Sequence, residues 1–129
     1  MKFLGVDWGL NRIGLAISEG EVASPLGTLN VQANSFDKAV AKVMAVAVEE
    51  KAQQLILGKP EGKMGKIVED VAKALRKQGA DVVLADETLS TQEAKRTMIE
   101  MGMGQKARRE DNAVAAAIIL QRYLDETKG

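Results

Sequence analysis

The first third of the chain carries short apolar runs that are typical of paired β-strands. Residues 3–6 and 13–18 are mostly apolar, and the polar connection between them contains glycine and asparagine, a combination that favours a β-hairpin. A third strand is expected within 22–31, where Pro25 and Gly27 restrict it to a sheet edge or bend it. This part of the chain therefore predicts an antiparallel meander of three strands.

The pattern then changes to a helix that begins near residue 35. Asn34 or Ser35 is expected to cap it, and Asp37 lies in its first turn, where a negative charge favours the helix. Apolar residues recur at helical spacing and give the helix one apolar face. They are Phe36, Val40, Val43, Met44 and Ala47.

Strands and helices alternate through the rest of the chain. Residues 55–57 and 82–85 are wholly apolar and predict central strands covered on both faces. Between them, 58–66 is expected to be a loop with three glycines and three lysines, followed by an amphipathic helix that closes near Gly79. A capping box at 90–93 opens a further helix, which fades at Gly102.

A basic connection and one strongly apolar helix complete the pattern. The connection covers 102–109, and the helix covers 111–126. Alternating strands and helices imply parallel strands joined by right-handed crossovers. We find no repeat and no long linker, so residues 1–129 are expected to form one α/β domain with a mixed five-stranded sheet flanked by helices.

The composition restricts the possible catalytic and metal chemistry more than it restricts the class of protein. Apolar residues make up 46% of the 129 residues, enough for a substantial core, and 18 basic residues balance 18 acidic ones. The balance excludes a polycation that would bind nucleic acid by bulk charge, although not a local basic face. The chain has no Cys and no His, which excludes thiol chemistry, His-based triads and the usual zinc sites. Carboxylates that hold a hard cation such as magnesium fit what remains.

The chain shows no sign of export or membrane insertion. Its first 15 residues lack a basic segment followed by a long apolar run, and no stretch approaches the roughly 20 apolar residues of a membrane helix. We therefore expect a cytoplasmic protein that does not bind membranes.

Three acidic residues are expected at one edge of the sheet. Asp7 ends the first strand, Glu87 follows the last, and Asp111 begins the final helix. Sites in open α/β sheets lie beyond the carboxyl ends of the strands, and converging carboxylates repel one another unless a divalent cation neutralises them. Taken singly, Asp7 could instead form a turn, and Glu87 and Asp111 could simply favour helix N-termini.

Two other motifs suggest simpler roles. Ser90 is better explained as a helix cap than as a nucleophile, because the chain offers no base to activate it. The loop from Gly58 does not match a P-loop, since Gly62-Lys63 comes one residue early and Met64 follows it. Its lysines could still contact phosphates, and a solvated loop is the alternative.

Five segments of the chain, in the same order, resemble the YqgF/RuvX family of small bacterial RNase H-like proteins, described as Holliday junction resolvases and as pre-16S rRNA nucleases. The segments are LGVDWGLNRIGLAIS (4–18), ASPLGTL (23–29), ILGKPEGKMG (56–65), ADETLSTQEA (85–94) and AAAIILQRYLDE (115–126). The resemblance implies an RNase H-like fold, dependence on magnesium or manganese, and hydrolysis of phosphodiester bonds in structured nucleic acid.

The resemblance also implies roles for single residues. The family's first two acids fall on Asp7 and Glu87, and Arg12 matches the basic residue after the first strand. Lys59 stands where the family usually has an apolar residue. The third acid falls by spacing on Asn112, one residue after Asp111. We assign the third acid to Asp111, with Glu110 as the alternative.

These observations lead to a metal-dependent endonuclease whose Mg²⁺ or Mn²⁺ ions are held by the three acids. One ion would lower the pKa of an attacking water, and the other would stabilise the leaving 3′-oxygen. The natural substrate would be precursor 16S rRNA, processed at its 5′ end, or a Holliday junction, bound by a monomer or a homodimer. Basic residues expected to hold backbone phosphates are Arg12, Lys59, Lys63, Lys106, Arg108 and Arg109.

Two other functions stay open at this point. One is a nucleic-acid-binding module with an incomplete catalytic site, which Asn112 at the position of the third acid favours. The other is a nucleotide-binding fragment of the actin and sugar kinase type, suggested by Asp7-Trp8-Gly9 after the first strand. That class closes two such domains around ATP, and this chain is long enough for one.

Overall fold

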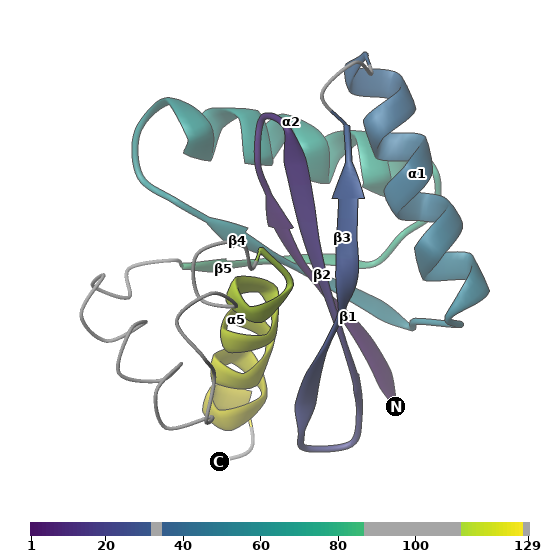
Figure 1. Ribbon diagram of the computed structural model, residues 1–129, viewed down its shortest axis with the longest axis vertical. Helices are drawn as coiled ribbons and strands as arrows, with labels where there is room; N and C mark the ends of the chain where they lie inside the picture. Colours follow the sequence, from purple (N-terminus) through teal and green to yellow (C-terminus); the bar gives the residue numbers. More distant parts are fainter. Residues whose placement is uncertain (32–34, 87–111, 128–129) are drawn as a thin grey trace.

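Five strands form one mixed sheet in the order β3-β2-β1-β4-β5 (Figure 1). A computed structural model describes residues 1–31, 35–86 and 112–127. The strands are β1 (Lys2–Trp8), β2 (Arg12–Glu19), β3 (Ala23–Asn30), β4 (Gln54–Lys59) and β5 (Val82–Asp86). The helices in the described ranges are α1 (Phe36–Glu49), α2 (Lys63–Lys77) and α5 (Asn112–Thr127).

The sheet has the expected topology. β1, β2 and β3 form an antiparallel meander, and β4 and β5 add parallel to it beside β1. β3 lies at the edge, and the pairing between β2 and β3 shifts register at Leu15 and Ala16, opposite the part of β3 that contains Pro25. This placement agrees with the prediction of an edge or bent strand, because proline has no N–H to donate to a ladder.

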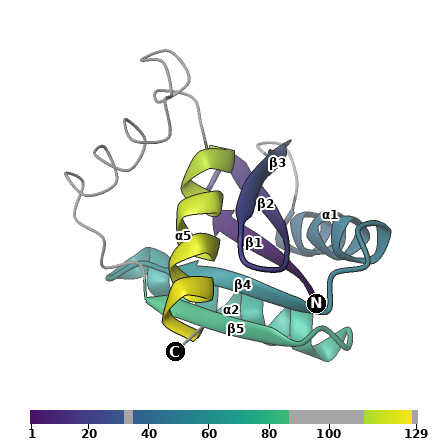
Figure 2. The same ribbon diagram turned by 90° about the horizontal axis from the view of Figure 1, so that it is seen from below.

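Helices cover the sheet on both faces (Figure 2). α1 and α2 pack on one face and α5 on the other. The α1/α2 face buries the larger core, which includes Leu4, Val6, Ile13, Leu57, Val43, Val71 and Leu75. The α5 face buries a smaller core, which includes Ala16, Ile56, Ala116, Ile119, Leu120 and Leu124. Helices on both faces of a largely apolar sheet are the usual arrangement of an α/β domain.

The start of α1 agrees with the sequence prediction. Ser35 is the N-cap, and its side-chain oxygen accepts a hydrogen bond from the backbone N–H of Lys38 at 3.3 Å. The predicted Asp37 lies in the first turn. The cap satisfies one of the N–H groups that a helix start leaves unpaired.

The predicted loop over 58–66 is much shorter than expected. Gly58 and Lys59 continue β4, because they pair in register with Ala85 and Asp86 of β5. The chain then turns at Gly62, whose φ of 81° is open to glycine at little cost, and α2 begins at once with Lys63. Pairing to a neighbouring strand, which the local pattern does not reveal, outweighs the loop preference of glycine here.

Other expectations fall partly outside the described residues. The capping box with Ser90 and the helix up to Gly102 lie wholly outside them. The last helix is described from Asn112, one residue after the predicted start. In the described part of the chain, none of the helices is long and apolar enough to cross a membrane.

Candidate active site

Asp7 lies near the carboxyl end of β1, on the face of the sheet that α5 covers. Side chains alternate along a strand, and Leu4 and Val6 belong to the core under α1 and α2. Gly5 and Asp7 therefore face the other way. A Cβ at Gly5 would lie 2.8 Å from Leu120 Cβ, which confirms that this face of β1 meets α5.

The first residue of α5 rests on the backbone of β2 beside Asp7. Gly14 is the register partner of Asp7 in the antiparallel pair. A Cβ at Gly14 would collide with the backbone of Asn112, chiefly its carbonyl oxygen, so the helix start can sit there only because residue 14 is glycine. The strands β1 and β2 and the N-terminus of α5 thus meet at one place, next to the Asp7 carboxylate.

Asp7 is electrostatically unusual. Its side chain is partly buried, and burial raises its pKa from an ordinary value near 3.8 to about 6. Within the described residues, no hydrogen bond or ion pair engages its carboxylate. A carboxylate taken out of water without a cationic partner is costly in its charged form. The position therefore favours a bound cation, and an oxygen ligand suits magnesium or manganese.

Only one of the three predicted acids is described. Glu87 follows Asp86, the last residue of β5, and Asp111 precedes Asn112, but both lie outside the described residues, as does Glu110. Across the described ranges, no group of three acidic side chains is gathered closely enough to hold a metal ion. The chemistry of Asp7 fits a hard metal, and all three ligand assignments stay predictions.

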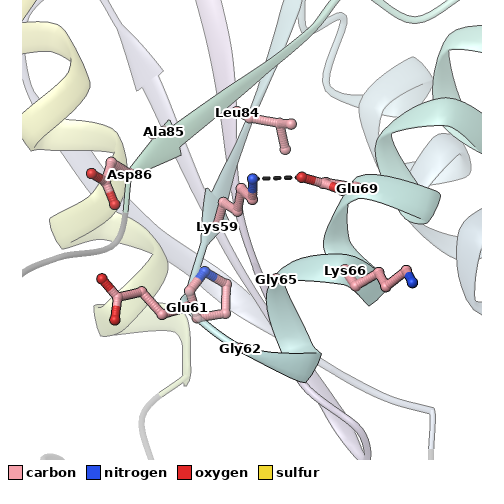
Figure 3. A pocket seen from close by; sticks show the side chains of 10 residues that line it. Lys59, Glu61, Gly62, Gly65, Lys66, Glu69, Leu84, Ala85 and Asp86 are labelled. Carbon is pink, nitrogen blue, oxygen red and sulfur yellow. Dashed lines mark ion pairs between the residues drawn. The ribbon is translucent and has the colours of Figure 1, made fainter.

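Lys59 lies on the opposite face of the sheet from Asp7. It pairs in register with Asp86 and forms an ion pair with Glu69 of α2 at 2.5 Å between Nζ and Oε1 (Figure 3). A hollow of about 710 Å³ opens here, and Leu84 and Lys66 are among its lining residues. This hollow is on the α2 side, so it is separate from the place where α5 begins.

The other predicted phosphate ligands are placed unevenly. Arg12 is exposed and begins β2, two residues before Gly14, so it lies on the α5 face at the same end of the sheet as Asp7. Lys63 is exposed in the first turn of α2. The remaining three, Lys106, Arg108 and Arg109, lie outside the described residues.

The sequence analysis did not identify the two glycines against which α5 packs closely. Gly5 and Gly14 appear in the sequence only as interruptions of apolar strands. A glycine inside a strand is itself a signal that another backbone approaches closely, and that signal is present at both positions. What the sequence could not supply is which backbone approaches, because Asn112 is about a hundred residues away from Gly14.

Comparison with known proteins connects these features to one family. The family model described as "RuvX: Holliday junction resolvase" matches residues 1–126. A protein of Listeria monocytogenes serovar 1/2a, named "Putative pre-16S rRNA nuclease", is 32% identical over 139 aligned positions that cover 98% of this chain and 99% of the relative.

Solved structures show the same fold. Thermus thermophilus RuvC in complex with a Holliday junction substrate superposes with a TM-score of 0.66 at 20% identity, over 100% of this chain and 96% of that one. A ROK hexokinase from the same organism gives a TM-score of 0.53 at 17% identity, over 81% of this chain and 39% of the hexokinase. At these identities only the fold is compared, and it is the RNase H-like fold of resolvases, which part of the hexokinase shares. Because the family model spans nearly every residue, the chain belongs to the RuvX family of Holliday junction resolvases, a family of nucleases.

Proposed function

We propose that this protein is a metal-dependent endonuclease that hydrolyses phosphodiester bonds in structured nucleic acid. Asp7, Glu87 and Asp111 would hold Mg²⁺ or Mn²⁺. The observation that carries the proposal is the Asp7 carboxylate, which is partly buried, has a raised pKa and has no cationic partner among the described residues. A nuclease that lacks His and Cys has few other means of activating water.

Chain connectivity supports the choice of the other two acids. Glu87 comes two residues after Ala85, whose side chain packs toward α5, and the residue between them, Asp86, faces α2. Asp111 immediately precedes Asn112, whose carbonyl oxygen rests against Gly14 beside Asp7. Both acids therefore adjoin described residues that belong to the Asp7 side of the sheet or to its border.

The chain's own groups have distinct tasks in this proposal. A divalent ion, when bound, supplies the acidity that makes water a nucleophile and the charge that stabilises the leaving oxygen. Asp7 supplies a preorganised negative charge, and its burial keeps competing water away. Arg12, exposed at the same end of the α5 face, would bind a backbone phosphate and so orient the scissile bond.

The relatives point to two kinds of substrate. The Listeria relative is named for precursor 16S rRNA, and the Thermus structure contains a Holliday junction. We propose that the substrate is one of these or both, since each presents branched or folded backbone to the enzyme. Processing of the 5′ end of precursor 16S rRNA would place the protein in ribosome biogenesis in the cytoplasm.

The proposal is tested by cleavage of a four-way DNA junction and of precursor 16S rRNA with magnesium, with manganese and with excess chelator. We expect cleavage of at least one substrate only when metal is present, and a loss of about 10²-fold or more in Asp7→Asn. Asp86→Asn is the matched control, because it removes a carboxylate near Glu87 that lies on the α2 side. Full activity in chelator would overturn the proposal.

The third acid is tested in the same assay by three further variants. Asp111→Asn should abolish cleavage and leave the fold and substrate binding intact, whereas Glu110→Gln should be mild. If the two effects are exchanged, Glu110 is the ligand. If Asp111→Asn retains full activity and Asn112→Asp raises it sharply, the natural site is incomplete and the protein is a binding module.

A further inference from the structure

The charge of this neutral chain is distributed unequally, and α2 is its most basic described helix. The chain has 18 basic and 18 acidic residues, but α2 alone has five basic residues against two acidic ones, an excess of three positive charges. By contrast, α1 carries two basic and two acidic residues. The excess on α2 must therefore be offset elsewhere in the chain.

Four of the five positive charges of α2 form a stripe that points away from the sheet. At about 100° per residue, positions 63, 66, 70, 73 and 77 fall within an arc of about 80°. The buried residues of α2, among them Val68, Val71 and Leu75, occupy the opposite side of the helix. All five stripe positions are exposed, and four of them are lysine; Asp70 is the exception. We call Lys63, Lys66, Lys73 and Lys77 the α2 lysine stripe.

Neighbouring groups leave the stripe largely unneutralised. Glu69 has its pKa lowered first by its hydrogen bond and charge interaction with Lys59 and only then by Lys73 and Lys66. Arg76 donates a hydrogen bond to the carbonyl of Val82, so it serves the fold. In the described part of the chain, no ion pair engages any lysine of the stripe.

The stripe is too long and too far round the molecule to be part of the Asp7 site. Lys63 and Lys77 are separated by 14 residues of helix, or about 21 Å at 1.5 Å per residue. α2 and α5 cover opposite faces of the sheet (Figure 2). A straight duplex lying on the α5 face cannot also follow the outer surface of α2. A branched nucleic acid can, because its arms leave the branch in different directions.

We propose that the α2 lysine stripe binds the phosphate backbone of a second arm of a branched nucleic acid, while the arm that is cut lies at Asp7. This inference rests on the proposed function and names how its substrate is selected. The partner is identified by charge complementarity: four lysines along one exposed helix face, with Asp70 as the one acid among them, fit a row of phosphates without reading bases. DNA and RNA share this chemistry.

The test compares salt-dependent binding to branched and linear nucleic acid in the presence of chelator, where nothing is cut. The variant is Lys73→Gln/Lys77→Gln, at the C-terminal end of α2 and therefore at the end of the stripe farther from the carboxyl ends of the strands. The matched control is Lys38→Gln/Lys42→Gln, which removes the same charge from two exposed lysines of α1. Each protein is titrated with a four-way DNA junction, a linear DNA duplex of the same arm sequence, and an RNA of the same branching.

We expect the Lys73→Gln/Lys77→Gln variant to lose affinity for the DNA junction and to lower its salt slope by about 1.8, the value for two duplex phosphates at about 0.9 each. Binding of the linear duplex, which can occupy only one face at a time, should change less than binding of the junction, and the α1 control should match wild type throughout. A loss with only one backbone identifies DNA or RNA as the natural arm. An unchanged slope with both junctions, or an equal loss with the linear duplex, would overturn the inference. Failure of the proposed function would appear separately, as absence of metal-dependent cleavage by wild type.

Discussion

At the scale of single residues, Asp7 is held in a setting that opposes its own charge. Asp7 is paired to Gly14 of β2, and β1 is paired to β4 up to Val6, so the Asp7 backbone is held on the sheet with its side chain on the face that α5 covers. Burial raises its pKa to about 6, which means that near neutral pH the folded protein carries a charge that the surroundings disfavour. Such groups are common where a protein binds a ligand of opposite charge.

This predicts that Asp7→Asn stabilises the metal-free protein. The unfolded chain releases the Asp7 proton near pH 3.8 and the folded chain near pH 6. The folded state therefore binds more protons in this window, and stability falls as pH rises from about 4 to about 6. Two pKa units correspond to an upper limit of about 3 kcal/mol. Urea unfolding in chelator well above pH 6 should show a higher unfolding free energy for Asp7→Asn, by up to that amount, and no gain below pH 4. Equal stability at both pH values would show that the carboxylate is not desolvated.

The sequence was sufficient to single out Asp7 and Lys59 as candidate site residues. It was not sufficient to predict on which face of the sheet each side chain lies. Asp7 was predicted because it ends an apolar strand, and the structure places it at the expected sheet edge. Lys59 was predicted from a glycine-rich segment without knowledge of the strand register. Its pairing opposite Asp86 places it on the α2 side, beside Glu69. A shift of one position along a strand changes the face, and only the pairing of the strands determines it.

At the scale of elements, the close packing of α5 on β1 and β2 brings the start of this helix next to Asp7. The helix lies close against the backbones of β1 and β2 at Gly5 and Gly14. Further along the helix, the side chain of Gln121 accepts a hydrogen bond from Ala23 N–H and donates one to the Glu21 carbonyl, both at 2.9 Å. These contacts fix the position of the helix along the sheet and its rotation.

We therefore predict that Gly14→Ala damages catalysis through the position of α5. The new Cβ would collide with the Asn112 carbonyl, and relief of an overpacked contact typically costs about 1 to 3 kcal/mol. The thermal midpoint should fall, and kcat should fall by more than KM rises, since Arg12, the exposed residue proposed to bind phosphate, keeps its place. Gly27→Ala is the matched control, because a Cβ there meets nothing within 4 Å. A stable Gly14→Ala protein with normal kcat would show that the contact between Gly14 and the start of α5 does not position the catalytic residues.

At the scale of the whole molecule, the sheet separates two kinds of surface. The α5 face carries Asp7 and Arg12, and the α2 face carries the hollow beside Lys59 and the α2 lysine stripe. The sequence was sufficient for the element order and for the mixed sheet, because apolar periodicity and turn residues are local. It was not sufficient for the division between faces, which depends on strand register and on the long-range contacts of Gly5 and Gly14.

The most direct test of a metal site at Asp7 is the binding of Mn²⁺ well above pH 6, measured by calorimetric titration of wild type, Asp7→Asn and Asp86→Asn. Asp7 and Asp86 lie at the same edge of the sheet but on opposite faces. A comparison of the two variants therefore shows which face binds the metal. A metal site at Asp7 predicts that wild type and Asp86→Asn bind Mn²⁺ alike and that Asp7→Asn binds at least about tenfold more weakly, since a carboxylate ligand is lost. Equal binding by wild type and Asp7→Asn, or a loss confined to Asp86→Asn, would contradict it.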